Sequence, residues 1–175
     1  HLRKAGYTSQ QIVIGGDSAG GGLSLALLGQ LLARGGDRPA GVFAFSPLTD
    51  MSFSSPSMEE NAHSDVLLPV GRARECADFY LVGHDVNDPR VSPVHADMTG
   101  APPVYLAVSK REILRDDTLR MEASLRKSGV CVALELHDAA PHAWPIFHGL
   151  IPEAEETLCS VSRWIKTLWR TEGES

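Results

Sequence analysis

The chain has 175 residues, of which 43% are hydrophobic, and a formal net charge of -6 at pH 7. This length and apolar content are sufficient for one domain with a hydrophobic core. The negative charge argues against nucleic acid or an anionic membrane surface as the main partner. No apolar run approaches the ~20 residues that a membrane-spanning helix needs.

Three cysteines, Cys76, Cys131 and Cys159, are scattered along the chain and form no C-x-x-C pair. Their odd number and wide spacing argue against a disulfide framework and against a zinc site. This pattern favours a reducing compartment, so we expect a cytoplasmic protein. We expect Cys131 and Cys159 to be small buried residues of a strand and a helix.

Short apolar runs alternate with segments of helical periodicity. We expect buried strands at residues 12–15, 41–45, 104–108 and 130–136, and helices at residues 18–34, 72–81, 115–128 and about 152–168. The polar segments 51–70 and 83–103 are predicted to be irregular. In the first helix, Leu23, Leu27 and Leu31 share one face. Strands that alternate with helices predict βαβ units and a mostly parallel sheet with flanking helices, the α/β class.

The segment Gly16–Gly20 fits the G-x-S-x-G pattern and lies between the first predicted strand and the first predicted helix. Small neighbours at such a turn allow a strained backbone that points the serine hydroxyl outward. The pattern indicates Ser18 as a nucleophile and the N–H of Ala19 as an oxyanion donor. The alternatives are a glycine-rich cap with Ser18 as the N-cap, or a phosphate loop, for which the usual glycine patterns are missing.

Ligands of parallel sheets bind at the carboxyl ends of the strands, so residues that follow each predicted strand are candidates for the site. Glu112, Asp116 and Asp117 follow the third strand, and His142 follows the fourth. Serine, carboxylate and histidine therefore occur in the order of an α/β-hydrolase triad. A histidine can take the serine proton and return it to a leaving alcohol, while a carboxylate fixes the histidine tautomer.

Several spaced motifs resemble those of the hormone-sensitive-lipase-like esterases of the α/β-hydrolase superfamily. They are Gly16–Gly21 (GDSAGG), Ser46–Asp50 (SPxxD), Asp88–Pro93 (DPxxSP), Asp97–Pro103 (similar to DLxGLPP), Glu112–Asp117 (the acid-bearing stretch) and Pro141–Trp144 (the histidine loop). Together they extend over nearly the whole chain. The resemblance implies a carboxylic ester hydrolase that forms an acyl-enzyme with a small-molecule ester of short to medium acyl length. It implies no cofactor and no metal.

By that resemblance, Ser18 is the nucleophile, His142 is the general base and then the general acid, and Glu112 is the orienting carboxylate. Two other histidines, His137 and His148, lie near the end of the same strand. His137 is expected to belong to the strand itself, which leaves His142 as the preferred base.

The identity of the acid has alternatives, because most members of the family carry Asp where this chain has Glu112. Asp116 and Asp117 have a structural interpretation as negative residues in the first turn of a helix. Asp116 and Asp50, which follows the second strand, are the alternative acids. The segment 109–111, Ser-Lys-Arg, also departs from the family pattern; its two cations either lower the pKa of the acid or point to solvent.

Residues 51–94 resemble the lid that this family inserts before the third strand of the chain. Within and near that insertion, Met51, Phe53 and Trp144 are candidates to line the substrate pocket, with core packing as the alternative interpretation. Asp17, beside the nucleophile, is a further candidate for substrate binding.

The family's HGGG-type oxyanion loop and its first four strands do not occur in these residues. We therefore expect residues 1–175 to be the C-terminal portion of a single α/β-hydrolase domain, beginning within a helix that ends at Gly6. The strand at residues 12–15 would then have an uncovered edge. The hypothesis is that residues 1–175 alone are poorly soluble and nearly inactive.

Two other functions remain open. The same triad could act on a lactone, an amide or an arylacetamide. Alternatively, the chain could be a non-catalytic binding protein, as plant gibberellin receptors of this family are, although the presence of both Ser18 and His142 argues against that. The resemblance also implies a possible homodimer through the last strand, residues 130–136.

Overall fold

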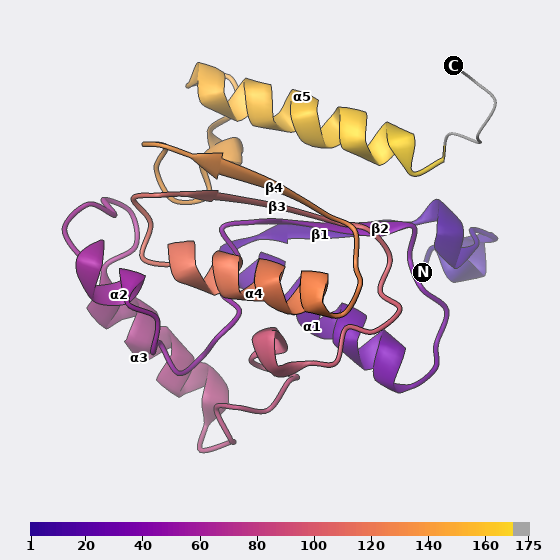
Figure 1. Ribbon diagram of the computed structural model, residues 1–175, viewed down its shortest axis with the longest axis horizontal. Helices are drawn as coiled ribbons and strands as arrows, with labels where there is room; N and C mark the ends of the chain where they lie inside the picture. The colour runs from indigo at the N-terminus through magenta and orange to yellow at the C-terminus, as the bar shows by residue number, and fades with distance from the viewer. Residues whose placement is uncertain (170–175) are drawn as a thin grey trace.

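The computed structural model describes residues 1–169, and the polar tail at residues 170–175 lies outside them. Within the described residues, four strands form a parallel sheet in the order β1-β2-β3-β4 (Figure 1). They are β1 (Val13–Asp17), β2 (Gly41–Phe45), β3 (Val104–Ser109) and β4 (Val132–His137). The predicted α/β class is confirmed, and each predicted strand end lies within two residues of the observed one.

The helices follow the predicted periodicities closely. They are α1 (Ser18–Ala33), α2 (Ser57–Glu60), α3 (Val70–Leu81), α4 (Arg115–Lys127) and α5 (Pro152–Thr167), with short 3-10 helices η1 (Arg3–Ala5), η2 (Ser9–Gln11), η3 (Pro93–His95) and η4 (Trp144–Phe147). The segment 51–70 was predicted to be irregular, but it contains α2 and the first residue of α3. The single turn α2 is too short to produce a visible periodicity.

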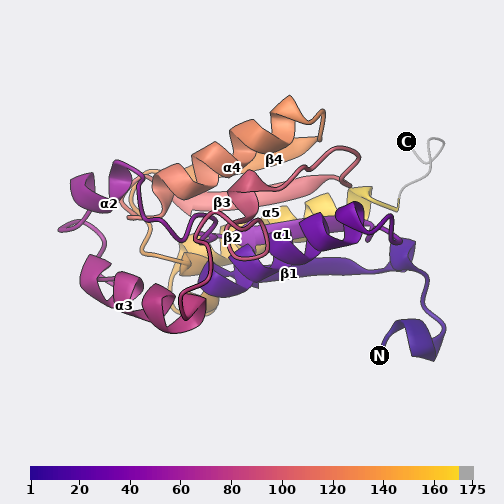
Figure 2. The ribbon, with the colours of Figure 1, turned by 90° about the horizontal axis from the view of Figure 1, so that it is seen from below.

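The sheet is covered by helices on both faces (Figures 1 and 2). Helices α1 and α4 lie on one face, and α5 lies on the other. Helices α2 and α3 lie beyond the carboxyl ends of the strands. Each layer has its own buried apolar cluster: Leu25, Leu28, Val42, Leu106 and Met121 under α1 and α4, Phe45, Tyr105, Ala107, Trp144 and Val161 under α5, and Phe53, Met58, Ile113 and Leu114 under α2 and α3.

The register of the sheet brings the carboxyl ends of the strands to one edge. Asp17 at the end of β1 is opposite Phe45 of β2, and Ser109 at the end of β3 is opposite His137 of β4. The loops after all four strands therefore begin at the same edge of the sheet, which is where ligands of parallel sheets bind.

The leucine face of α1 does not belong to the core. Leu23 is 55% exposed and Leu27 is 47% exposed, whereas Leu25 and Leu28 are fully buried against the sheet. Helix α1 thus carries apolar side chains on two faces, and its hydrophobic pattern alone does not identify the buried one.

The prediction that Cys131 and Cys159 are buried is wrong, because both side chains are exposed. Cys131 immediately precedes the edge strand β4. Cys159 lies on the outer side of α5, whose inner side is formed by Ala154, Thr157 and Val161.

Helix α1 approaches the loop after β2 so closely that one glycine has no room for a side chain. A Cβ atom on Gly22 would lie 2.0 Å from the carbonyl oxygen of Leu48, whereas a Cβ atom on Gly20 would meet no atom within 4 Å. Both glycines belong to the same helix, so they form a matched pair.

We predict opposite effects for Gly22→Ala and Gly20→Ala on the free energy of unfolding. Gly22→Ala should lower it by roughly 1–3 kcal/mol because α1 must move away from Leu48. Gly20→Ala should raise it by up to about 1 kcal/mol because alanine is the better helix former. Denaturant unfolding of both variants measures the difference, and equal effects of the two substitutions would contradict the close packing at Gly22.

Candidate active site

Ser18 lies at the sharp turn between β1 and α1. Its φ is 51°, a left-handed conformation that is rare for residues other than glycine. A Cβ atom on Gly16 would lie only 2.5 Å from the carbonyl carbon of Gly20, so the turn requires glycine at position 16. The strained turn leaves the Ser18 residue partly exposed at the carboxyl edge of the sheet.

A chain of hydrogen bonds joins Ser18, His142 and Glu112. The Oγ atom of Ser18 is 2.9 Å from Nε2 of His142, and Nδ1 of His142 is 2.6 Å from Oε2 of Glu112. Because a carboxylate only accepts, the Nδ1 atom carries the proton and Nε2 is free to accept the serine hydroxyl. The Glu112 side chain is 1% exposed and the His142 side chain is 10% exposed, so this pair is shielded from water.

The other carboxylate oxygen of Glu112 is also fully engaged. Its Oε1 atom accepts the backbone N–H of Ser109 at 2.6 Å and the hydroxyl of Ser46 at 2.9 Å. Ser109 ends β3, and Ser46 follows β2. These hydrogen bonds satisfy the buried carboxylate oxygen and hold the side chain in one orientation.

The other carboxylates near the site form hydrogen bonds and ion pairs with other partners. Asp50 pairs with Arg120 at 2.6 Å, and Asp116 pairs with Arg115 at 2.7 Å. Asp117 accepts the backbone N–H groups of Thr49 and Asp50 and the hydroxyl of Ser55. These carboxylates fix the loop after β2 against α4, and none of their hydrogen bonds involves His142.

The alternative bases also have other partners. The Nδ1 atom of His137 accepts the N–H groups of Ala139 and Ala140, which stabilises the turn after β4. His148 pairs with Glu155 at the exposed surface. Of the three histidines near the end of β4, His142 alone contacts Ser18 within the described residues.

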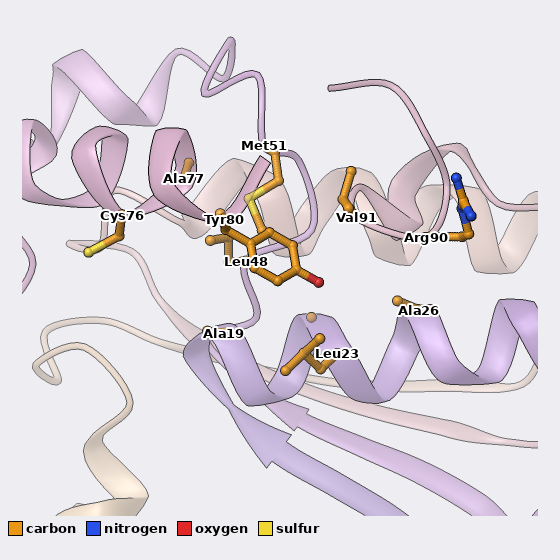
Figure 3. Close-up of a pocket in the computed structure, with 11 residues that line it drawn as sticks. Ala19, Leu23, Ala26, Leu48, Met51, Cys76, Ala77, Tyr80, Arg90 and Val91 are labelled. Carbon is orange, nitrogen blue, oxygen red and sulfur yellow. The ribbon is translucent and has the colours of Figure 1, made fainter. Parts of the chain in front are cut away.

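An apolar cavity of about 250 Å³ begins at Ala19, the residue that follows Ser18 in the chain (Figure 3). It extends between α1 and α3, from Ala19 to Arg90. Its lining comes from α1, the loop after β2, α3 and the segment that follows α3: Ala19, Gly22, Leu23, Ala26, Leu48, Met51, Cys76, Ala77, Tyr80, Arg90 and Val91. Leu23, on the exposed leucine face of α1, therefore lines part of this cavity.

Of the four residues expected to bind substrate, only Met51 lines this cavity. Trp144 does not, because its side chain is fully buried under α5, where its Nε1 atom donates to Thr157 at 2.9 Å. Phe53 is 6% exposed and packs with Met58 in the cluster under α2 and α3. Asp17 is exposed at the end of β1 and is not part of the lining. Core packing accounts for Trp144 and Phe53.

Among residues 1–169, no group of three His, Cys, Asp or Glu side chains could hold a metal ion. No helix among the same residues is both long enough and apolar enough to cross a membrane.

The sequence profile of the alpha/beta hydrolase fold family matches residues 1–146. The chain belongs to this family. An acetyl-hydrolase from Streptomyces hygroscopicus is 31% identical over 95% of this chain and 56% of its own length, and an esterase from Acinetobacter venetianus is 31% identical over 93% and 54%. The chain thus spans about half the length of the curated relatives it matches.

Solved structures agree with this family membership. A crystal structure of an esterase from the bacterial hormone-sensitive lipase family is 34% identical and superposes with a TM-score of 0.92, over 95% of this chain and 56% of that chain. A hormone-sensitive lipase from a metagenome library is 31% identical with a TM-score of 0.90, over 95% and 57%. The resemblance inferred from the motifs is confirmed.

Sequence reasoning missed two groups of residues at this α/β-hydrolase site. Ser46 and Ser109, which bond Glu112, come from strand ends whose proximity depends on the register of the sheet. The cavity residues Leu23, Ala77 and Tyr80 lie on two helices far apart in sequence. One feature of the sequence could have indicated the cavity: α1 has a second apolar face, which includes Leu23 and does not pack on the sheet.

The buried carboxyl group of Asp117 has an unusual titration. Burial, the largest effect, raises its pKa from 3.8 to about 6, although three hydrogen bonds to the carboxylate oppose the change. The folded protein therefore retains a proton between pH 4 and 6 that the unfolded chain releases. The fold favours the protonated form of Asp117, so the contribution of this group to the free energy of unfolding decreases as the pH rises from 4 to 6.

We predict that Asp117→Asn gains stability over the wild type as the pH rises from 4 to 6, by roughly 1–3 kcal/mol. The asparagine oxygen can accept the N–H groups of Thr49 and Asp50, while its amide donates to Ser55. Denaturant unfolding at a series of pH values measures the difference.

Asp116→Asn is the matched control for this prediction. The hydrogen bond from Arg115 is the largest cause of the lowered pKa of Asp116, so this variant should lose stability relative to the wild type as the pH rises toward about 4 and change little between pH 4 and 6. A stability difference for Asp117→Asn that does not vary with pH would contradict the titration assigned to this group.

Proposed function

We propose that this chain belongs to a carboxylic ester hydrolase in which Ser18 is the nucleophile, His142 the general base and acid, and Glu112 the orienting carboxylate. The observation that carries the proposal is the continuous hydrogen-bonded chain from Glu112 through His142 to Ser18, with distances of 2.6 and 2.9 Å. The similar proteins, an acetyl-hydrolase and esterases, support the same reaction class.

The reaction would proceed through an acyl-enzyme. The Oγ atom of Ser18 attacks the ester carbonyl carbon while its proton moves to Nε2 of His142. When the tetrahedral intermediate collapses, that proton passes to the leaving alcohol. A water molecule then attacks the acyl group while its proton moves to Nε2 of His142. When this second intermediate collapses, the bond between the acyl carbon and Oγ breaks, His142 returns the proton to Oγ of Ser18, and the carboxylic acid leaves.

Ala19 would contribute to the oxyanion hole. Its N–H belongs to the first turn of α1, where backbone donors have no partner within the helix and the helix dipole favours negative charge. An oxyanion formed beside Ser18 would therefore accept a hydrogen bond from this group.

The cavity beside Ala19 would hold the apolar part of the ester. Its volume of about 250 Å³ and its lining by Leu23, Met51, Ala77 and Tyr80 suit a short to medium acyl chain. In this proposal, residues 51–94 form a lid-like insertion, and α3 provides the roof of the pocket. Residues 1–175 would form the C-terminal portion of a single hydrolase domain, with further oxyanion donors supplied by other segments.

The same chemistry would also open lactones and activated amides, because both present a carbonyl carbon to the nucleophile. A substrate panel of p-nitrophenyl acetate, butyrate and octanoate, a lactone and an acyl anilide separates these classes. We expect the esters of short and medium acyl chains to be cleaved with the highest kcat/KM.

A homodimer through β4 is a further proposal. Within the described residues, β4 pairs only with β3 and leaves its outer edge free, and Leu136 is 39% exposed. A second copy could continue the sheet at this edge. Sedimentation of the purified protein should then give twice the monomer mass, and a monomer at micromolar concentration would exclude this assembly.

A serine-directed fluorophosphonate probe, applied to the full-length protein, tests the proposed nucleophile. We expect the protein to be labelled, Ser18→Ala to abolish labelling, and Ser18→Ala or His142→Gln to lower kcat/KM by about 10⁴-fold or more. Ser128→Ala, a serine at the end of α4, is the matched control and should be labelled like the wild type. Unchanged labelling of Ser18→Ala would refute the proposal, and a protein that is never labelled would favour the non-catalytic binding alternative.

A further inference from the structure

Ser46 is a strained and fully buried residue at the end of β2. Its exposed fraction is 0% and its φ is 47°, a left-handed conformation that glycine adopts at lower cost. A serine retained at such a position suggests that its side chain makes contacts that glycine cannot make.

The hydroxyl of Ser46 contacts two parts of the candidate site at once. Its Oγ atom donates to Oε1 of Glu112 at 2.9 Å and accepts the backbone N–H of Ala143 at 3.0 Å. The backbone N–H of Ser46 donates to the carbonyl of Ala107 in β3 at 2.7 Å, which ties this residue to the neighbouring strand. A single hydroxyl thus bridges the carboxylate and the residue that follows His142.

Both hydrogen bonds of the Ser46 hydroxyl restrict rotation, one in the Glu112 side chain and the other in the backbone at Ala143. Glutamate has one more side-chain torsion than aspartate, and the bonds from Ser46 and Ser109 to Oε1 leave Oε2 directed at Nδ1 of His142. Ala143 has a φ of 50°, so the histidine loop is itself strained at this point. The bond to Ser46 holds the loop in the conformation that directs His142 toward Ser18.

We propose that Ser46 is a positioning residue, which aligns Glu112 and His142 through one hydroxyl without touching the substrate. The proposal rests on the proposed hydrolase function for its kinetic consequences. Its geometric consequence, the fixed hydrogen bond between Glu112 and His142, does not depend on turnover.

The test compares Ser46→Ala and Ser46→Gly in the purified protein, since both remove the hydroxyl but only glycine relieves the strain at φ 47°. We expect both variants to lower kcat by about tenfold to hundredfold with little change in KM, the range expected for loss of a hydrogen bond to a charged group. Fluorophosphonate labelling of Ser18 should slow by a similar factor. Wild-type kcat in Ser46→Gly would overturn the proposal, because shape and strain would then explain the residue.

A second measurement reports on the hydrogen bond without turnover. The downfield ¹H NMR resonance of the His142 Nδ1 proton should shift or broaden in both Ser46 variants. Thr118→Val is the matched control, because Thr118 is fully buried and its hydroxyl bonds only the carbonyl of Leu114. This control should lower stability without moving the resonance.

The possible outcomes separate the two proposals. If the resonance responds to Ser46 but the wild type cleaves no substrate and is not labelled, the hydrolase function fails and the positioning role stands. If the resonance of Ser46→Ala matches that of the wild type, or if Thr118→Val moves it equally, the positioning role is overturned.

Discussion

The structure of the site depends on surrounding one buried carboxyl group with hydrogen-bond donors. Glu112 is almost completely buried, and a polar group in such a place is destabilising unless it is hydrogen-bonded. Three donors do so: the backbone of Ser109, the hydroxyl of Ser46 and the imidazole of His142. Ser46 follows β2, Ser109 ends β3 and His142 lies in the loop after β4, so the carboxylate is satisfied only when these three strands are in register.

The segment before α3 reinforces this arrangement. The amide of Asn61 donates to the carbonyls of Lys110 and Glu112, and the carboxylate of Asp65 accepts the N–H of Ile113. The hydroxyl of Ser57 donates to the carbonyl of Ile113 in the same loop, and its backbone N–H donates to the carboxylate of Asp116 in the first turn of α4. The segment around α2 thus supports the loop that carries Glu112, whereas α3 lies over the apolar cavity.

Much of the fold was predictable because its signals are local. The apolar runs of β2 and β3 and the periodicity of α4 and α5 depend on residues that are neighbours in the sequence, and their observed limits agree closely with the predicted ones. The approach of Ser18, Glu112 and His142 could be predicted because parallel strands end at one edge and because the spaced motifs resemble a known family.

Other features depend on contacts that a single sequence does not reveal. Trp144 and Phe53 have the aromatic character of pocket residues, but packing under α5 and α2 buries them. Cys131 and Cys159 are exposed because one precedes an edge strand and the other lies on the outer side of a helix. The contribution of Ser46 depends on a positive φ and on the register between β2 and β3, neither of which its neighbours in the sequence indicate.

We propose that the imidazole of His142, oriented by Glu112, makes the Ser18 hydroxyl nucleophilic. The test is rapid acid quenching of the full-length protein with p-nitrophenyl butyrate, followed by mass spectrometry of the tryptic peptide at residues 5–34. We expect a butyryl group on Ser18 that forms within the first turnover and disappears as the substrate is exhausted. Release of nitrophenol at a steady rate while the peptide remains unmodified would contradict it.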